Sequence, residues 1–198
     1  VNQPIIISTG MSIISEIDEC LSSLTNSGQD LSKVTLLHCS SEYPADIANL
    51  NLHALTLLKE RFNTSIGYSD HTKGINTGML SVALGATIIE KHITLSCNDD
   101  GPDHKASLDP KNFKEYVEGI KEAQIILGKK IKQPSEVEKD NAVVSRQAIV
   151  AKNNIQKGKK FDLENLTLKR AGQGMSPMVI RKLIGQESSK EYQIDDLI

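Results

Sequence analysis

The sequence predicts an α/β protein, with the second half of a (β/α)8 barrel (a TIM barrel) followed by a small, mostly β domain. Three observations lead to this fold class. Apolar, strand-like runs alternate four times with stretches of helical periodicity. The runs are almost continuously apolar and end in polar residues, as parallel strands covered on both faces do. The composition changes after Lys129, which indicates a second domain.

The expected strands lie where β-branched and aliphatic residues cluster, and a helical pattern follows each of them. The expected strands are Pro4–Ile7, Val34–His38, Ser65–Tyr68 and Ala86–His92. The expected helices are about Ile13–Leu24, Ala48–Phe62, Ile75–Leu84 and Lys111–Leu127. Polar residues at the strand ends fit a barrel, because its catalytic residues lie at the carboxyl ends of parallel strands.

Four βα units give only half of a barrel, since a complete one usually needs about 250 residues. An open, doubly wound sheet is the alternative, but Ser8-Thr9-Gly10-Met11 is too short to be a Gly-rich phosphate fingerprint. A half-barrel leaves the first and last strands unpaired, which favours pairing with another chain. We therefore expect a fragment of a longer protein, or a part that a partner completes.

The segment 131–141 is charged, contains Pro134 and lacks periodicity, which predicts a linker between residues 1–130 and the second domain. Residues 142–198 contain short segments separated by Gly-containing turns, at 146–150, 156–161 and 166–169. A short helix is expected with Ser176 as its N-cap and Pro177 at its first position. A mostly β domain of about 55 residues needs support to be stable.

Charge and composition exclude several classes of function. The formal net charge of -2 and the pI of about 6.2 supply no positive field to hold nucleic acid. Apolar runs such as Ile5-Ile6-Ile7 are far shorter than the roughly 18 to 20 residues of a membrane span. Cys20, Cys39 and Cys97 form no CxxC pattern, so neither a disulfide framework nor a thiolate zinc site is indicated. A cytoplasmic protein without a membrane or nucleic-acid partner is expected.

His71 and His92 are the candidate metal ligands. Each follows a strand, in Ser69-Asp70-His71-Thr72 and Glu90-Lys91-His92, and Gly101-Pro102-Asp103-His104 comes next. The separation of the two histidines corresponds to one strand, one helix and one loop, which places them at the ends of adjacent strands. A single histidine at a strand end is usually a packing residue, but two of them flanked by Asp70 and Glu90 favour a metal site with open positions at the barrel mouth.

Five motifs resemble the bacterial sialic acid synthases in order and spacing. They are Ile7-Ser8-Thr9-Gly10-Met11, Leu37-His38-Cys39-Ser40-Ser41-Glu42-Tyr43-Pro44, Gly67-Tyr68-Ser69-Asp70-His71-Thr72, Ile89-Glu90-Lys91-His92-Ile93-Thr94 and Gly101-Pro102-Asp103-His104. The tail, with Ile155-Gln156-Lys157-Gly158 and Lys169-Arg170-Ala171-Gly172-Gln173-Gly174, is similar to their C-terminal antifreeze-like (SAF) domain. The resemblance covers essentially the whole chain and makes residues 142–198 the expected SAF domain.

The resemblance implies an enzyme that joins phosphoenolpyruvate to an N-acetylmannosamine-type sugar and gives N-acetylneuraminate and phosphate. It implies a divalent cofactor, Mn²⁺ first and Mg²⁺ second, held by His71 and His92. It also implies a domain-swapped homodimer, in which the small domain of one subunit covers the active site of the other. The positions that match substrate-binding residues are Ser8, Ser41, Tyr43, Ser69, Asp103 and Arg170. The catalytic glutamates and phosphoenolpyruvate-binding lysines of the family match no residue here and are expected upstream of Val1.

The chain departs from the family pattern at Ser41, where relatives carry asparagine, and at Ala171 and Gln173, where they carry proline and asparagine. His104, Lys105 and Ser107, which follow Asp103, resemble the N-acetylneuraminate and legionaminate branch more than the pseudaminate branch. A legionaminate or pseudaminate synthase of the same family is therefore one alternative function. A noncatalytic sugar-binding or interaction module is a second, and a metal-dependent hydrolase that uses the two histidines and Asp103 ranks last.

Overall fold

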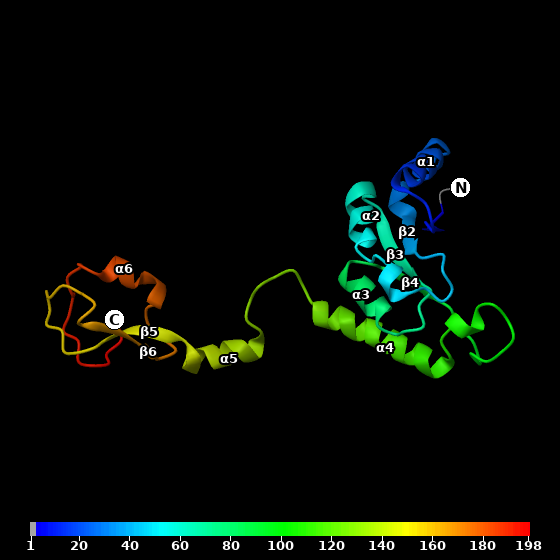
Figure 1. Ribbon diagram of the computed structural model, residues 1–198. Helices are drawn as coiled ribbons and strands as arrows, with labels where there is room; N and C mark the ends of the chain where they lie inside the picture. The colour runs from blue at the N-terminus through cyan, green and yellow to red at the C-terminus, as the bar shows by residue number, and fades with distance from the viewer. Residues whose placement is uncertain (1–2) are drawn as a thin grey trace. The chain divides into compact units, whose positions relative to one another are not determined.

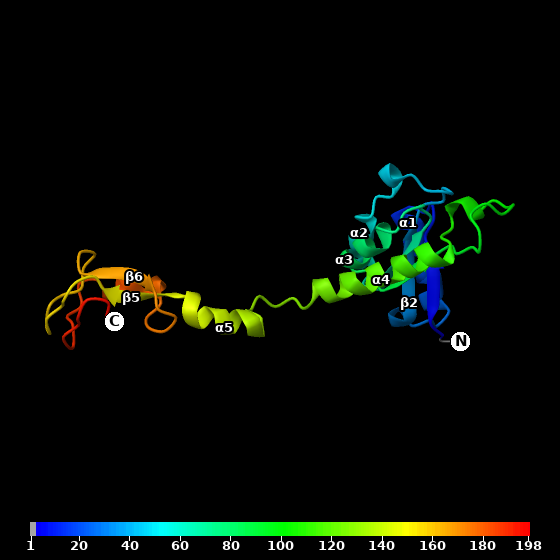
Figure 2. The same ribbon diagram turned by 90° about the horizontal axis from the view of Figure 1, so that it is seen from below.

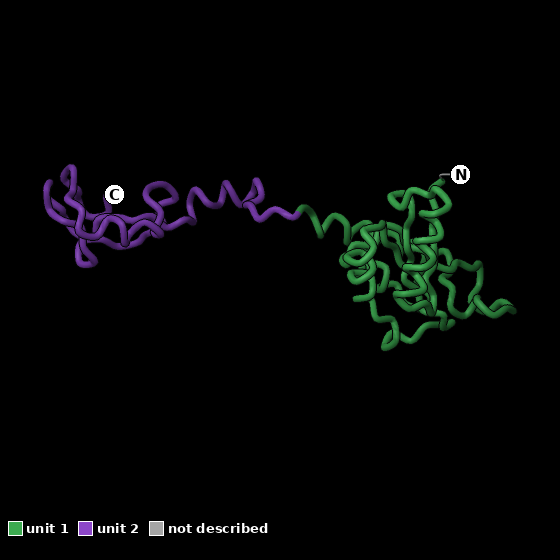
Figure 3. The backbone as a smooth tube through the Cα atoms, turned by 90° about the horizontal axis from the view of Figure 1, so that it is seen from above, with its two compact units in different colours: residues 1–129 green, residues 130–198 purple. Residues whose placement is uncertain are grey.

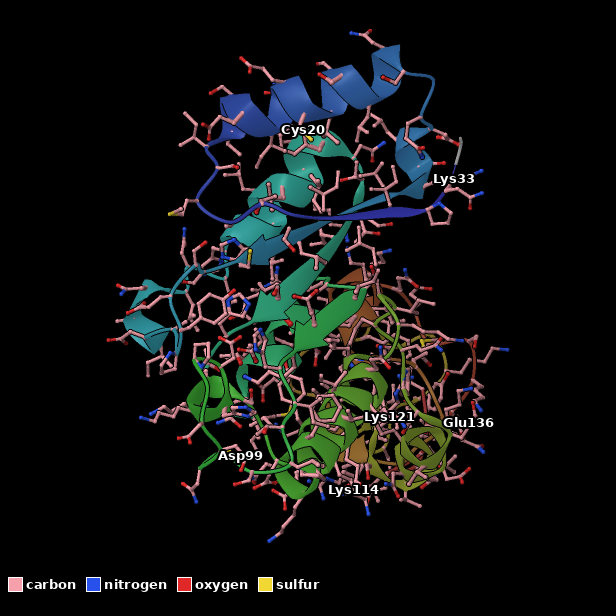
Figure 4. The ribbon with its side chains drawn as sticks, turned by 90° about the vertical axis from the view of Figure 1, so that its right-hand side faces the viewer. Cys20, Lys33, Asp99, Lys114, Lys121 and Glu136 are labelled. Carbon is pink, nitrogen blue, oxygen red and sulfur yellow. The ribbon has the colours of Figure 1, made fainter. Side chains whose placement is uncertain are left out.

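The computed structural model describes residues 3–198, in two compact units (Figure 3). Unit 1 is Val1–Lys129 and unit 2 is Lys130–Ile198. Unit 1 contains the four expected strands in a single parallel sheet with the order β1-β2-β3-β4. The strands are β1 (Ile5–Ser8), β2 (Val34–Cys39), β3 (Ser65–Asp70) and β4 (Ile88–Lys91).

The helices of unit 1 connect the strands and cover one face of the sheet (Figures 1 and 2). They are α1 (Ile14–Asn26), α2 (Ala54–Phe62), α3 (Thr77–Ala83) and α4 (Pro110–Leu127). The first turn of α4 is fixed by Asp109, whose carboxylate accepts a hydrogen bond from the Asn112 N–H at 2.8 Å, and by Pro110 at the first position. The helix expected over 48–62 begins late, because Asn51 has a φ of 44° and interrupts the turn.

The core of unit 1 lies between the sheet and these helices. Val34, Leu36, Ile66 and Tyr68 are almost fully buried and belong to one cluster with apolar residues of α1 and α2. On the opposite face of β1, Ile6 is 56% exposed. Strands in sequential order with helices on one face form a half-barrel, so the doubly wound alternative is wrong.

Unit 2 differs from the expected linker and mostly β domain. The segment expected as a linker, 131–141, contains the start of α5 (Glu136–Ser145). Its capping box explains the helix: the Glu138 N–H donates to the Ser135 hydroxyl at 3.2 Å, and the Ser135 N–H donates to the Glu138 carboxylate at 2.7 Å. None of the residues of α5 is buried, so local capping rather than packing accounts for this element.

The expectation of a mostly β second domain is wrong. Unit 2 has one two-stranded antiparallel sheet, of β5 (Gln147–Ala151) and β6 (Leu166–Arg170), with five residues in each strand. The α-helices α5 and α6 (Ile180–Leu183) have ten and four residues. The segment 156–161 forms no strand, because Gly158 turns the chain at a φ of 84° and only isolated bridges flank it.

The unit 2 core is small and centres on β5, with Ile149, Ile155, Phe161 and Tyr192 buried together. Ser176 caps the expected helix through its hydroxyl, which accepts from the Met178 N–H at 3.3 Å. That helix begins as a 3-10 turn, η4 (Pro177–Val179), and continues as α6. Within residues 3–198, no helix is both long and apolar enough to cross a membrane.

Candidate functional site

The candidate site lies where β3 and β4 end side by side. The parallel register pairs Ser69 with Glu90 and Asp70 with Lys91. Because successive side chains point to opposite faces of a strand, Ser69 and Glu90 share one face and Asp70 and Lys91 share the other. The same alternation places His71 on the face of Ser69, and the distance of 3.2 Å between the Ser69 hydroxyl oxygen and His71 Nε2 agrees with this.

The two predicted metal ligands come together. The ring centroids of His71 and His92 lie 5.4 Å apart, with the ring planes at 84°. The Tyr43 ring, from the loop after β2, lies 4.1 Å from the His71 ring and 5.6 Å from the His92 ring. Three side chains from three consecutive βα loops therefore form one cluster, which we call the histidine–tyrosine cluster.

His71 is held firmly at this position. Its ring is buried, and Nδ1 lies 2.5 Å from the Ser40 carbonyl oxygen. A carbonyl can only accept, so Nδ1 carries the proton in this contact and Nε2 presents a lone pair toward the site. The His71 carbonyl in turn accepts from the Ala45 N–H at 2.9 Å. This arrangement is typical of a metal-binding histidine oriented by a backbone carbonyl.

Glu90, which the sequence marks only as a neighbour of His92, adds a carboxylate to the site. Its Oε1 accepts a hydrogen bond from the Ser69 hydroxyl at 2.6 Å, and the residue is exposed on the face of the histidines. The signal that identifies it is the i, i+2 spacing to His92 at the end of a strand. Asp70, which also flanks the motif, lies on the opposite face, so its carboxylate points away from the two histidines.

Asp103 and His92 line a common hollow of about 300 Å³. The hollow belongs to the loop between β4 and α4, which a bridge between Ile93 and Leu108 closes at its base. The Ser107 hydroxyl donates to the Asp103 carbonyl at 2.7 Å and fixes the turn that carries this aspartate. A carboxylate is thereby placed beside a candidate metal ligand, in a space large enough for part of a sugar.

The other predicted substrate-binding residues are distributed unevenly. Ser8 ends β1, and a Cβ added at Gly10 would lie 3.5 Å from the Ser41 hydroxyl, so both serines belong to the carboxyl edge of the sheet. Arg170 ends β6 in unit 2, opposite Gln147, and is exposed. The structure therefore brings together Tyr43, Ser69, His71 and His92, with Asp103 beside His92.

Electrostatic effects keep two groups near the site protonated. Burial raises the pKa of the Cys39 thiol, which accepts a hydrogen bond from the Gly10 N–H at 3.2 Å. Desolvation is the main cause that raises the pKa of Tyr43, and the nearby Cys39, Asp103 and Glu90 raise it further. The Tyr43 phenol therefore remains a hydrogen-bond donor at neutral pH.

The donor set fits a divalent ion with several open positions. Two imidazoles face each other, and imidazole suits ions from Mn²⁺ to Zn²⁺. Among residues 3–198, no group of three or more His, Cys, Asp or Glu side chains has the arrangement of a complete metal site. These residues therefore form no closed structural zinc site. The geometry agrees with a metal ion that is held by two histidines and keeps coordination positions open for water and substrate.

Fold and site together define a class of protein: a barrel-type α/β enzyme scaffold with a histidine pair at the carboxyl edge of its sheet. The NeuB family model matches residues 1–132. The chain belongs to the NeuB family. The chain is 45% identical over 197 residues to the N,N'-diacetyllegionaminic acid synthase of Campylobacter jejuni, and this match covers 100% of the chain and 59% of that protein.

Two solved structures are similar to the chain. The N-acetylneuraminic acid synthetase of Leptospira borgpetersenii, solved in complex with citrate, is 37% identical, with a TM-score of 0.63 over 69% of this chain and 47% of that one. A spore coat polysaccharide biosynthesis protein E from Chromobacterium violaceum has a TM-score of 0.80 over 100% of this chain and 60% of that one, at 22% identity, which shows the fold alone. The relatives named as synthases place the chain in a family of sugar acid synthases.

These matches correct the predicted fold class. The chain spans 59% of the C. jejuni relative, and the family match over residues 1–132 covers the half-barrel of parallel strands. The matched region supports a barrel part of the NeuB family, and the assignment to a second half followed by an SAF domain is wrong. The family match ends before α5, and the described fold of unit 2 is not the expected mostly β domain.

Proposed function

We propose that this chain supplies the metal-binding and sugar-binding edge of an active site that condenses phosphoenolpyruvate with the open-chain form of an N-acetylated amino sugar. A carbon–carbon bond forms between C3 of phosphoenolpyruvate and the sugar aldehyde, water adds at C2, and phosphate leaves. The product is a nine-carbon sugar acid. The observation that carries the proposal is the approach of His71 and His92 at adjacent strand ends, beside the hollow lined by Asp103.

A divalent ion bound by His71 and His92, with Mn²⁺ as the first choice and Mg²⁺ as the second, would polarise the sugar aldehyde. Tyr43 covers the two imidazoles and offers a phenolic donor to a sugar oxygen. Asp103 is placed to accept hydrogen bonds from sugar hydroxyls in the hollow that it shares with His92. The residues with these roles all lie in unit 1.

The remaining residues suit the anionic substrate. The hydroxyls of Ser8 and Ser41 can donate at the carboxyl edge of the sheet, where the carboxylate or phosphate of phosphoenolpyruvate would approach, and Ser69 lies at the same edge with its hydroxyl proton directed to Glu90. Glu90 accepts from the Ser69 hydroxyl and thereby fixes its rotamer. This carboxylate also adds negative charge beside the histidines, which favours a bound cation.

The sugar is either N-acetylmannosamine, giving N-acetylneuraminate, or a diacetamido sugar, giving N,N'-diacetyllegionaminate. The Leptospira structure supports the first by its name, and the C. jejuni relative supports the second with the higher identity of 45%. The protein that carries this chain should therefore be assayed with both sugars. The sugar with the higher kcat/KM for phosphate release identifies the substrate.

The metal proposal is tested with His92→Ala in the protein that carries this chain. Mn²⁺ binding can be measured as a decrease of the electron paramagnetic resonance signal of the free ion. In this variant, both Mn²⁺ binding and phosphate release should disappear. His53→Ala is the matched control, because His53 is an exposed histidine at the start of α2, and it should change neither quantity. Parental Mn²⁺ binding in His92→Ala would refute the site.

A further inference from the structure

We infer that the buried ion pair between Asp70 and Lys91 positions His71 and His92 relative to each other, so that both imidazoles reach one metal ion. Asp70 immediately precedes His71 at the end of β3, and Lys91 immediately precedes His92 at the end of β4. This inference rests on the proposed function, because it assigns a role to the residues behind the proposed metal pair.

The ion pair lies on the face of the sheet opposite to the site. Asp70 and Lys91 are cross-strand partners in the β3–β4 register, and Lys91 Nζ lies 3.3 Å from Asp70 Oδ1. Their side chains are 0% and 1% exposed, respectively. A lysine and an aspartate are almost never this deeply buried unless they are paired. The pair therefore fixes the ends of the two strands at the residues next to the histidines.

The Asp70 carboxylate is saturated with further hydrogen bonds. Oδ1 accepts from the Thr72 N–H at 2.9 Å and from the Thr72 hydroxyl at 2.8 Å. Oδ2 accepts from the Thr77 hydroxyl at 2.5 Å and from the Tyr116 hydroxyl at 2.9 Å. These donors come from the β3–α3 loop, the first turn of α3 and the middle of α4. One carboxylate thus connects β3 with both helices that pack behind the site.

Lys91 closes the same loop from the other strand. Its ammonium donates to the Thr72 carbonyl oxygen as well as to Asp70, and it lies 5.6 Å from the centroid of the Tyr116 ring. The backbone of His71 is therefore held between Asp70 and Thr72, because the Lys91 ammonium forms an ion pair with Asp70 and a hydrogen bond with Thr72. Movement of one histidine relative to the other would break these bonds.

Stability alone is a weaker explanation for this pair. Replacing a buried ion pair by apolar residues of similar volume is often neutral or stabilising, because the penalty for desolvating both charges offsets much of the energy of their attraction. Desolvation lowers the pKa of Lys91, and attraction by Asp70 opposes this effect. Asp70 and Lys91 each precede one candidate ligand by a single residue, and their burial carries a desolvation penalty. The positioning of His71 and His92 therefore explains the pair better than stability does.

The test measures Mn²⁺ affinity in the protein that carries this chain, by electron paramagnetic resonance, without reference to activity. Lys91→Met should weaken Mn²⁺ binding by about 10- to 100-fold, as loss of groups that orient metal ligands does. Ser81→Ala is the matched control: Ser81 is fully buried in α3, and its hydroxyl donates to the Gly78 carbonyl at 2.7 Å and not to the Asp70 carboxylate. It should keep the parental Mn²⁺ affinity.

A second variant covers the case in which Lys91→Met leaves an uncompensated charge and does not fold. Asp70→Asn/Lys91→Met removes both charges and retains an amide that bonds with Thr72 and Thr77. We expect this double variant to fold and to bind Mn²⁺ about 10- to 100-fold more weakly than the parent. A folded double variant with parental Mn²⁺ affinity, or an equal loss in Ser81→Ala, would overturn the inference.

A readout that needs no metal separates this inference from the proposed function. This readout is the NMR chemical shift of the imidazole rings of His71 and His92 in histidine-labelled protein. Both ring signals should shift in the double variant and stay unchanged in Ser81→Ala. If the parent binds no Mn²⁺, the metal proposal fails, and the ring signals alone decide the positioning role. Unchanged ring signals in the double variant would refute that role.

Discussion

Gly78 in α3 leaves the space through which Tyr116 reaches Asp70. A Cβ at this position would lie 2.6 Å from both Cζ and the hydroxyl oxygen of Tyr116. Gly78→Ala should therefore lower the free energy of unfolding by about 1 to 3 kcal/mol, as overpacking of a dense core does. Urea unfolding measures this loss. Gly74→Ala is the control, because no heavy atom lies within 4 Å of its added Cβ, and an equal loss there would contradict the argument.

Tyr116 also predicts a dependence of stability on alkaline pH. Burial is the main cause that raises the pKa of Tyr116 far above its ordinary value of 10.0, and the negative charge of the Asp70 carboxylate raises it further. The folded state then keeps a proton that the unfolded chain loses, so this contribution to stability is complete below about pH 10 and is lost as the pH rises further. Tyr116→Phe should lose less stability than the parent between about pH 9 and pH 11.

The measurement is urea unfolding of both proteins across that pH range. Burial also raises the pKa of Tyr68, but this residue is present in both proteins and its effect cancels in the comparison. At neutral pH, Tyr116→Phe should be less stable by about 1.5 to 3 kcal/mol, because it removes a hydrogen bond to a charged acceptor. Parallel pH profiles would show that Tyr116 does not titrate differently in the two states.

At the scale of elements, α5 depends on its N-terminal cap. The helix buries no residue, and the Ser135–Glu138 capping box satisfies its first turn. Ser135→Ala should destabilise α5 by about 0.5 to 2 kcal/mol. Amide hydrogen exchange of residues 136–145 should accelerate, while that of β5 should not. Lys139→Ala, which removes only an exposed ion pair with Glu136, is the control, and equal acceleration by it would contradict the role of the cap.

The elements that could be predicted are those with strong local signals. Apolar β-branched runs predict β1 to β4 to within two residues at either end, because periodicity and burial agree there. The helix α5 was missed, since its capping box lies in a charged segment whose apolar periodicity is weak. The short segment at 156–161 of the expected β domain forms no strand, because a turn at Gly158 interrupts it.

The candidate site shows the same division. Adjacency of His71 and His92 followed from one strand, one helix and one loop between them, and the structure confirms that their rings meet. The roles of Asp70 and Lys91 needed the β3–β4 register, because a shift of one residue would exchange the two faces of each strand. Sequence alone therefore identified the residues next to the histidines without showing which of them face the site.

At the scale of the molecule, the half-barrel has two open edges. In the sheet of unit 1, β1 and β4 each have one strand neighbour. The ammonium of Lys91, which would suit a phosphate, is bonded to Asp70 on the far face from the site. We expect the 198-residue chain alone to release no phosphate from phosphoenolpyruvate and an amino sugar. Turnover above the enzyme-free rate, measured by a phosphate assay, would contradict this expectation.

The last prediction concerns the homodimer that the family resemblance implies, in which one subunit would contribute Arg170 to the site of the other. A guanidinium offers several donors in one plane to an amide carbonyl and stays charged at any working pH. In the protein that carries this chain, Arg170→Ala should raise the KM for the amino sugar far more than that for phosphoenolpyruvate. The expected loss in binding is about 1.5 to 3 kcal/mol, the contribution of a hydrogen bond to a charged group.

Lys169→Ala is the control for this variant, because it removes the neighbouring positive charge, which pairs with Asp195, and should leave both KM values unchanged. Subunit exchange tests the dimer itself. Mixing Arg170→Ala with His71→Ala protein should restore part of the activity, since a mixed dimer combines one intact histidine pair with one intact arginine. Equal effects of Arg170→Ala on both substrates would show that Arg170 does not contact the sugar. Absence of restoration after verified exchange would show that unit 2 does not act across the dimer.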